Sequence, residues 1–126
     1  MQVGIVPSDL DASLHFYRDV LGFEYLGPVP VIEGRILHRF AVDGGILKLL
    51  ELPTTAAPPA HNPPPGAFQS ATGIRWITLH VADLDSYTGR CRDQVWQVAT
   101  TEIRPGVRFA IVEDPDGNAV ELVESR

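Results

Sequence analysis

Residues 3–23 read VGIVPSDLDASLHFYRDVLGF and carry the strongest structural signal in the chain. The segment opens with a short β-branched run, which favours a strand, and Asp9 then offers a helix N-cap side chain. Apolar residues recur from Leu10 to Leu21 at offsets of four, three and four, the spacing of one helix face. Gly22 is a natural C-terminal stop. The segment therefore predicts a strand followed by a helix.

A second stretch, residues 83–93, reads DLDSYTGRCRD and repeats the first helix. A shift of 74 residues aligns it with residues 9–19, and 5 of the 11 positions are identical. Unrelated sequences of average composition would agree at roughly one position. A shift of 73 places Asp43-Gly44 on Asp116-Gly117 further along the chain. The chain is thus predicted to contain two copies of one unit.

Each half is predicted to contain a strand, a helix and three further strands. Turn signals separate these elements, and six of the 11 prolines cluster between the halves. The expected organisation is a single α+β domain with module one at 1–52, a proline-rich linker at 53–70 and module two at 71–126. Predicted strands cover 3–6, 23–29, 35–42, 46–52, 74–81, 97–103, 107–113 and 118–123, and predicted helices begin at 10 and near 82–85.

Composition excludes several classes of partner. The formal charge is 10 − 16 = −6, and an acidic chain without a Lys/Arg cluster is a poor ligand for nucleic acid or anionic membranes. The apolar runs are far shorter than the ~20 residues that span a bilayer, and no signal-peptide pattern opens the sequence. A single cysteine, Cys91, forms no intrachain disulfide. These observations favour a cytoplasmic protein, with Cys91 packed in the core.

Residues 3–23, together with DPDGNAVEL at 114–122, resemble the vicinal oxygen chelate superfamily. This superfamily includes glyoxalase I, bleomycin-resistance proteins and extradiol dioxygenases. The resemblance implies two tandem βαβββ modules that form a cup-shaped, curved mixed β-sheet with helices on the outside. It also implies a small-molecule ligand and, by similarity to bleomycin-resistance proteins, a homodimer whose subunits share the pocket.

In metal-dependent members of that superfamily, four strand positions carry the metal ligands. The resemblance places these positions at Gln2, Lys48, Trp76 and Glu121, and the internal repeat pairs the first with the third and the second with the fourth. Divalent cations bind imidazole nitrogen and carboxylate oxygen, so the lysine ammonium and the indole are unsuitable. The sequence therefore predicts a member without the metal site: no cofactor is expected, and a divalent metal is disfavoured.

Organic side chains are then expected to form the site. Trp76 either stacks on a planar aromatic ligand or fills the core, and Thr78 and His80 share its strand face by the period-2 rule. His80 is either a second pocket group or a rim histidine. His38 lies mid-strand and is interpreted as a pocket wall or a core residue.

Charged groups give a further hypothesis. If the four positions converge, the Lys48 ammonium faces Glu121 and partly replaces the missing cation. Glu121 is then either a pocket acid or base, or a structural relic. His38, His80 and Glu121 could form a different metal site, but their spacing in the sequence does not indicate one. Three strand-associated cations either meet solvent or bind an anionic ligand: Arg39, Arg75 and Arg108.

Three functions compete on this evidence. The first is a metal-independent binding protein for a small planar or aromatic ligand, with a resistance or sequestration role. The second is a metal-free isomerase, lyase or cyclase of secondary metabolism that uses Glu121 and His80 for acid–base chemistry. The third is a metal-dependent lyase, isomerase or dioxygenase with non-standard ligands.

Overall fold

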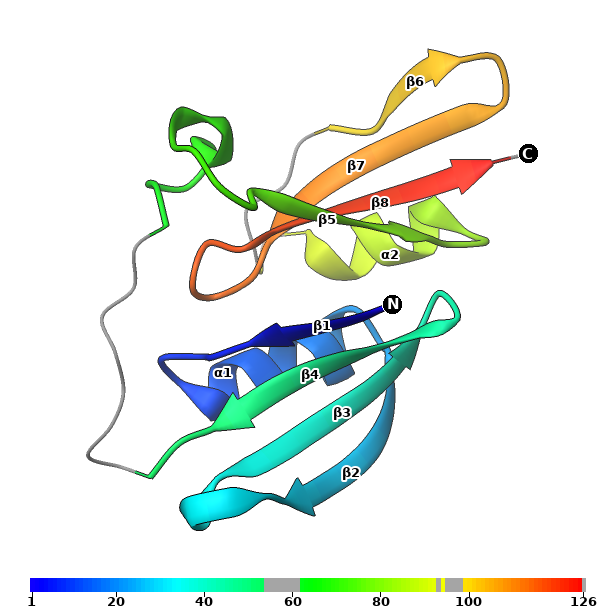
Figure 1. The fold of residues 1–126 in the computed structure, drawn as a ribbon. Helices are drawn as coiled ribbons and strands as arrows, with labels where there is room; N and C mark the ends of the chain where they lie inside the picture. The colour runs from blue at the N-terminus through cyan, green and yellow to red at the C-terminus, as the bar shows by residue number, and fades with distance from the viewer. Residues whose placement is uncertain (54–61, 93, 95–98, 126) are drawn as a thin grey trace. The chain divides into compact units, whose positions relative to one another are not determined.

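The structure is a computed structural model that describes residues 1–53, 62–92, 94 and 99–125 (Figure 1). The chain divides into two compact units, Met1–Ala60 and His61–Arg126, and each is described by itself. Each unit combines a four-stranded mixed sheet with helical segments, so the α+β prediction is confirmed. Within the described ranges, no helix is long and apolar enough to cross a membrane.

The first unit has strand order β1-β4-β3-β2. Strand β1 runs parallel to β4, and the other neighbours are antiparallel. The elements are β1 (Gln2–Ile5), α1 (Leu10–Leu14), a π-helix η1 (His15–Val20), β2 (Glu24–Pro30), a 3₁₀ turn η2 (Ile32–Gly34), β3 (Ile36–Val42) and β4 (Gly45–Glu51).

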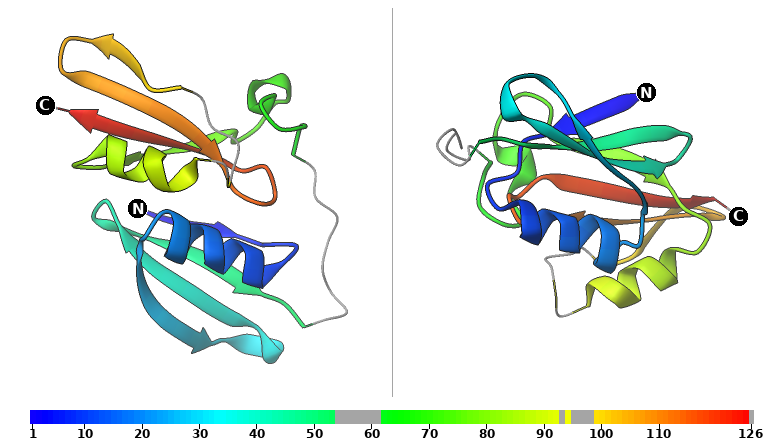
Figure 2. Two further views of the ribbon diagram at one scale, coloured as in Figure 1. Left: turned by 180° about the vertical axis from the view of Figure 1, so that it is seen from behind. Right: turned by 90° about the horizontal axis from the view of Figure 1, so that it is seen from below.

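The second unit repeats this topology with strand order β5-β8-β7-β6, and β5 is parallel to β8. Figure 2 displays the same strand–helix–hairpin path in both units. The predicted duplication is therefore confirmed at the level of the fold. The elements are a 3₁₀ turn η3 (Phe68–Ser70), β5 (Trp76–His80), α2 (Leu84–Cys91), β6 (Thr101–Arg104), β7 (Val107–Glu113) and β8 (Ala119–Ser125).

The strand registers reproduce the repeat residue by residue. Gly4 lies opposite Lys48 in the β1–β4 ladder, and Thr78 lies opposite Glu121 in the β5–β8 ladder. The two pairs are related by the shifts of 74 and 73 found in the sequence, since 4 + 74 = 78 and 48 + 73 = 121. Lys48 and Glu121 are thus structural equivalents in their two sheets.

The first helix differs from its prediction in its second half. It begins as expected, because the Asp9 carboxylate accepts a hydrogen bond from the Ala12 N–H at 3.2 Å. From His15 it is a π-helix, and the Leu21 N–H donates to the Phe16 carbonyl, five residues back, at 2.8 Å. The extra residue in this turn broadens the apolar face. Two adjacent pairs are buried there: Phe16 with Tyr17, and Val20 with Leu21.

The helix ends where the sequence predicts. Gly22 adopts a φ of +70°, the left-handed conformation that glycine tolerates best. The Phe23 N–H then closes the last turn by donating to the Tyr17 carbonyl at 2.9 Å. Tyr17 is fully buried and its ring lies 6.1 Å from that of Phe40 on β3, so the helix covers one face of the first sheet.

Helix α2 covers the corresponding face of the second sheet (Figure 1). The Asp83 carboxylate caps its N-terminus by accepting from the Ser86 N–H at 3.2 Å. Cys91 and Leu84 are fully buried on its inner side, which confirms a packing position for the cysteine. The buried apolar residues on this face of the sheet are Ala110, Val112, Val120 and Leu122.

Some predicted boundaries move. The strand expected at 74–81 is shorter, at Trp76–His80, and the one expected at 97–103 begins at Thr101, with 97 and 98 outside the described residues. Residues 54–61 of the proline-rich linker also lie outside them. The rest of the linker contains the turn η3 (Phe68–Ser70).

Candidate functional site

A cavity of about 600 Å³ lies in the second unit. This volume falls within the range of roughly 300–1,000 Å³ that is typical of small-molecule sites. Most of its lining is apolar or aromatic, with few polar groups. The lining residues are Gly66, Ala67, Phe68, Gln69, Ser70, Trp76, Phe109, Ile111 and Glu121.

The strand pleat explains why these residues meet. Thr78, Glu121 and Ile111 are directly opposite one another on β5, β8 and β7. Residues two positions away along a strand point to the same side, so Trp76 and Phe109 lie on the same side of the sheet as these three. The α2-covered side is occupied by the alternate residues. We call the opposite side of each sheet its helix-free face, and the cavity lies on that of the second sheet.

The end of the linker supplies another wall of the cavity. Asn62 Nδ2 donates to the Asp116 carbonyl at 2.9 Å and to Asn118 Oδ1 at 3.0 Å, while the Gly66 N–H donates to Glu113 Oε2 at 3.0 Å. These bonds anchor the segment to the second unit. Phe68 is consequently buried, with 7% of its surface exposed. The described end of the linker is therefore part of the cavity and not a passive spacer.

Two aromatic rings dominate the cavity. The Phe68 and Trp76 rings lie 5.9 Å apart at an interplanar angle of 82°, an edge-to-face pair. Trp76 begins β5, an edge strand of the sheet, and keeps 48% of its surface exposed. An indole that is fixed by one ring and still accessible offers a flat surface to a ligand.

Glu121 is the one ionisable residue among the lining residues that the structure describes. Its Oε1 accepts a hydrogen bond from Thr78 Oγ1 at 2.8 Å. That bond orients the carboxylate and leaves Oε2 as an acceptor for a ligand. The site therefore combines an aromatic surface with one positioned acceptor.

The structure brings together part of the predicted site. Trp76, Thr78 and Glu121 gather at the cavity through the contacts above. His80 lies on the same exposed side of β5, as the period-2 rule predicts, but it does not line the cavity. Whether any of these residues binds a ligand or takes part in catalysis stays a prediction.

In the first unit, Gln2 and Lys48 share the helix-free face with Ile46 and Gly4. His38 lies on the other side, because it pairs with buried Leu49. The structure therefore does not gather His38 with Lys48. Lys48 belongs to the first unit and Glu121 to the second, so their predicted pairing stays a prediction.

The surroundings of His38 are those of a buried, hydrogen-bonded residue. Its Nδ1 lies 2.7 Å from the Tyr25 hydroxyl and its Nε2 lies 3.3 Å from Glu51 Oε2. Only 8% of its surface is exposed. Both ring nitrogens are thus engaged, which leaves neither of them for a metal or a ligand in this conformation.

The four family positions do not fit a divalent cation. The Trp76 indole has no free lone pair and the Lys48 ammonium repels a cation, so two of the four positions that the resemblance assigns cannot be ligands. Among the residues that the structure describes, no group of three or more His, Cys, Asp or Glu side chains is arranged to hold a metal. We therefore derive no chemical step through a metal.

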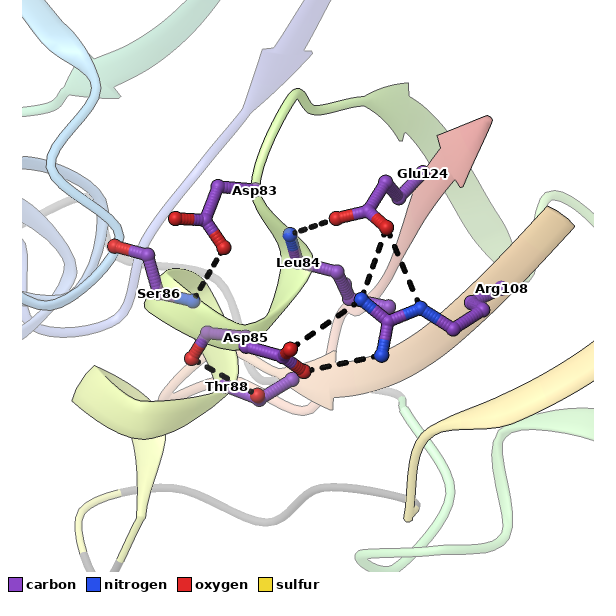
Figure 3. Close-up of polar contacts among 7 residues, drawn as sticks. All are labelled: Asp83, Leu84, Asp85, Ser86, Thr88, Arg108 and Glu124. Atoms are coloured by element: carbon purple, nitrogen blue, oxygen red, sulfur yellow. Dashed lines mark hydrogen bonds and ion pairs between the residues drawn. The ribbon is translucent and has the colours of Figure 1, made fainter. Parts of the chain in front are cut away.

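Arg108 lies in a network of hydrogen bonds and ion pairs between α2 and the second sheet (Figure 3). Its guanidinium donates to Glu124 Oε1 at 2.9 Å and to Asp85 Oδ1 at 3.2 Å. The Glu124 Oε2 in turn accepts from the Leu84 N–H at 2.7 Å, at the start of α2. Arg108 therefore fixes α2 to the sheet, and the two alternatives considered from the sequence, solvent or an anionic ligand, were both wrong for it.

The other two strand-associated arginines also have protein partners. Arg75 Nη2 donates to Asn62 Oδ1 at 3.0 Å and so helps to hold the end of the linker. Arg39 Nη2 lies 3.4 Å from the Leu26 carbonyl.

Several lining residues were missed by the sequence reasoning. Phe109 and Ile111 alternate along β7 within VRFAIVE, and this period-2 pattern placed them on one side of a strand. The sequence did not reveal that this side faces a cavity. Gln69 and Ser70 had no signal, because their place depends on how the linker folds back.

Comparisons with known proteins agree with this architecture. Residues 2–122 match the family described as the Glyoxalase/Bleomycin resistance protein/Dioxygenase superfamily. A probable lactoylglutathione lyase from Synechocystis sp. is 30% identical over 120 residues, covering 93% of this chain and 88% of the relative.

Two solved structures extend the comparison. TnmS3, an antibiotic binding protein from Streptomyces sp. CB03234, has a TM-score of 0.70 and 25% identity, covering 99% of this chain and 93% of its own. A lactoylglutathione lyase from Agrobacterium tumefaciens has a TM-score of 0.63 and 28% identity, and the match covers 98% of this chain and 91% of the lyase chain. Together with the repeated βαβββ topology and the match over residues 2–122, these similarities show that the chain belongs to the glyoxalase/bleomycin resistance/dioxygenase superfamily.

Proposed function

We propose that this protein binds a small, planar and largely apolar molecule in the second-unit cavity, without a resident metal, in a sequestration or resistance role. The observation that carries the proposal is Trp76. The resemblance assigns it to a metal-ligand position, and it presents a half-exposed indole, packed edge-to-face against Phe68, to the cavity. An aromatic surface of this kind favours stacking over chelation.

The ligand's polar group follows from Glu121. A lone carboxylate in an aromatic cavity favours a partner that donates a hydrogen bond or carries positive charge. Thr78 satisfies Oε1 at 2.8 Å, so the ligand's donor is expected at Oε2. The ligand class is therefore a planar aromatic molecule with an amine or hydroxyl substituent. The antibiotic-binding name of TnmS3 is in keeping with a binding role.

A matched series of probes tests this class. We expect 1-naphthylmethylammonium to bind more tightly than 1-naphthylmethanol, and 1-naphthoate to bind most weakly. Nuclear magnetic resonance titration, followed through the amides of residues 76–80 and 119–123, reports on this cavity specifically. Equal affinities for the three probes, or tighter binding of the carboxylate, would contradict the proposal.

Two variants separate the aromatic and the charged contribution. Trp76→Ala is expected to lower the affinity for all three probes by about tenfold, because the stacking surface is lost. Glu121→Gln keeps the shape and is expected to remove only the preference for the ammonium, about tenfold. Ile74→Ala, at a residue that is 88% exposed and does not line the cavity, is the control and should leave all affinities unchanged.

A catalytic role for Glu121 is the second candidate, and two similar proteins with lactoylglutathione lyase names favour it. Thr78 positions the carboxylate as a general base, with His80 further along the same strand face as the acid. The reaction would be a metal-free isomerase, lyase or cyclase step. If Glu121→Gln abolishes turnover of a bound ligand but preserves its binding, this candidate replaces sequestration.

A further inference from the structure

We infer that the helix-free face of the first sheet carries a binding site for an oxyanion, a carboxylate or phosphate group, formed by Lys48 and Arg39. The site lies in the first unit, on residues other than those that line the aromatic cavity proposed above. The two residues are direct cross-strand neighbours in the β3–β4 ladder. Their Cβ atoms are therefore about 5 Å apart.

Two cations in this arrangement repel each other. Like charges placed directly opposite in a sheet are destabilising unless something offsets them. Within the described residues of the first unit, neither residue has an ion-pair partner. The nearby Glu51 carboxylate is instead turned to His38 on the other side of the sheet. An external anion would neutralise the pair.

Arg39 is held in position for such a ligand. A β-bulge between Tyr25 and Gly27 exposes the Leu26 carbonyl, and Arg39 Nη2 lies 3.4 Å from it. The Arg39 Nε is buried and has no hydrogen-bond partner among the described atoms. A buried donor without an acceptor is costly. The guanidinium is therefore held at a fixed place, and the protein does not satisfy its Nε donor.

Space for the anion exists beside Lys48. Its other cross-strand neighbour is Gly4, and a Cβ built on Gly4 would meet no heavy atom within 4 Å. In the second unit, the equivalent row is Thr78, Glu121 and Ile111, and the last two line the cavity. The repeat thus places a cationic row where its counterpart forms an acidic, aromatic site.

The single lysine permits a direct test. Lys48 is the only lysine in the chain, so reductive ¹³C-dimethylation labels it and the N-terminal amine alone. The label keeps the positive charge, and Lys48→Arg assigns the two signals. We expect the Lys48 signal to shift saturably with inorganic phosphate at constant ionic strength. A parallel titration with acetate distinguishes a phosphate-specific site from one that also takes carboxylates.

Arg39→Gln is the decisive variant and is expected to weaken the affinity for phosphate by about tenfold, the usual effect of losing a charge-assisted hydrogen bond. Arg104→Gln removes one exposed charge from the second unit and should change nothing. Shifts that never saturate with either anion, or that respond equally to the two substitutions, would overturn the inference. Naphthyl probe binding at residues 76–80 is measured separately, so failure of one site is not failure of the other.

Discussion

The individual side chains of the cavity differ in how far the sequence could place them. Trp76 and Glu121 were placed by the resemblance to the superfamily, with which the repeat agrees, and Thr78 was placed on the side of Trp76 by strand alternation. His38 could not be placed in this way. In ILHRFAV, apolar residues occupy both sides of the strand, so alternation does not reveal which side is covered by the helix. The Tyr17–Phe40 contact decides it.

Cys91 gives a prediction at the level of a single residue. The thiol is fully buried, and burial raises its pKa from 9.0 to about 11. A neutral, covered thiol is unreactive. Iodoacetamide at pH 8 is therefore expected to leave Cys91 unmodified in the folded protein and to alkylate it in urea, as read by mass spectrometry.

The same pKa sets a pH dependence. The unfolded thiol loses its proton near pH 9 while the folded one retains it, so the unfolded state binds fewer protons between pH 9 and about 11. The stability contributed by Cys91 is present below pH 9 and is lost as the pH rises through this window. Urea unfolding of Cys91→Ala should show a shallower decline there, and an equally steep decline would contradict the assignment.

Among the elements, the strands were easier to predict than the interior of the first helix. Hydrophobic spacing and the Asp9 cap identified where the helix begins, and Gly22 identified where it ends. The π-helical segment has no signature in the spacing of apolar residues, because an added residue per turn still leaves one broad apolar face. The position of the π-helical segment depends on how the buried pairs Phe16–Tyr17 and Val20–Leu21 pack against the sheet.

Gly22→Ala tests the helix end. The left-handed φ of +70° disfavours a Cβ, so the substitution should lower the free energy of unfolding by about 1 kcal/mol. Gly89 is the matched control: it lies inside α2, and a Cβ there meets nothing within 4 Å. Gly89→Ala should raise the free energy of unfolding by roughly 0.5–1 kcal/mol. Urea denaturation measures both, and changes of the same sign would contradict this interpretation.

Arg108→Leu tests the attachment of α2. Removing the guanidinium leaves the Glu124 carboxylate buried without its cation, which typically costs about 3 kcal/mol. Arg35 is the control, because it lies just before β3 and its ion pair is with the exposed Glu33. Arg35→Leu is expected to cost less than about 1 kcal/mol. Comparable losses in the two variants would show that the Arg108 cluster is not the stronger attachment.

The two copies of one unit have kept a common topology while their equivalent positions have diverged. Gly4, Lys48 and Arg39 form one row, and Thr78, Glu121 and Ile111 form its counterpart. The sequence predicted that Gly4 corresponds to Thr78 and Lys48 to Glu121, because identities in helices and turns fix the alignment, but the correspondence of Arg39 with Ile111 comes from the strand registers. It could not predict the cavity, since that depends on the end of the linker folding onto the second sheet.

Assembly is a further prediction for the whole molecule. Similarity to bleomycin-resistance proteins leads us to expect a homodimer. Sedimentation equilibrium should then give twice the chain mass of 13.8 kDa. A mass that stays at one chain over the micromolar range would contradict the expectation.

The central claim is that organic side chains, and not a metal, form the ligand site of this superfamily member. The most direct measurement is titration calorimetry with 1-naphthylmethylammonium on protein purified without chelator, before and after exhaustive treatment with EDTA, with metal content determined in parallel. We predict substoichiometric metal and the same affinity in both samples, with binding lost in Trp76→Ala. Stoichiometric zinc, nickel, manganese or iron, together with loss of binding after EDTA, would contradict the account.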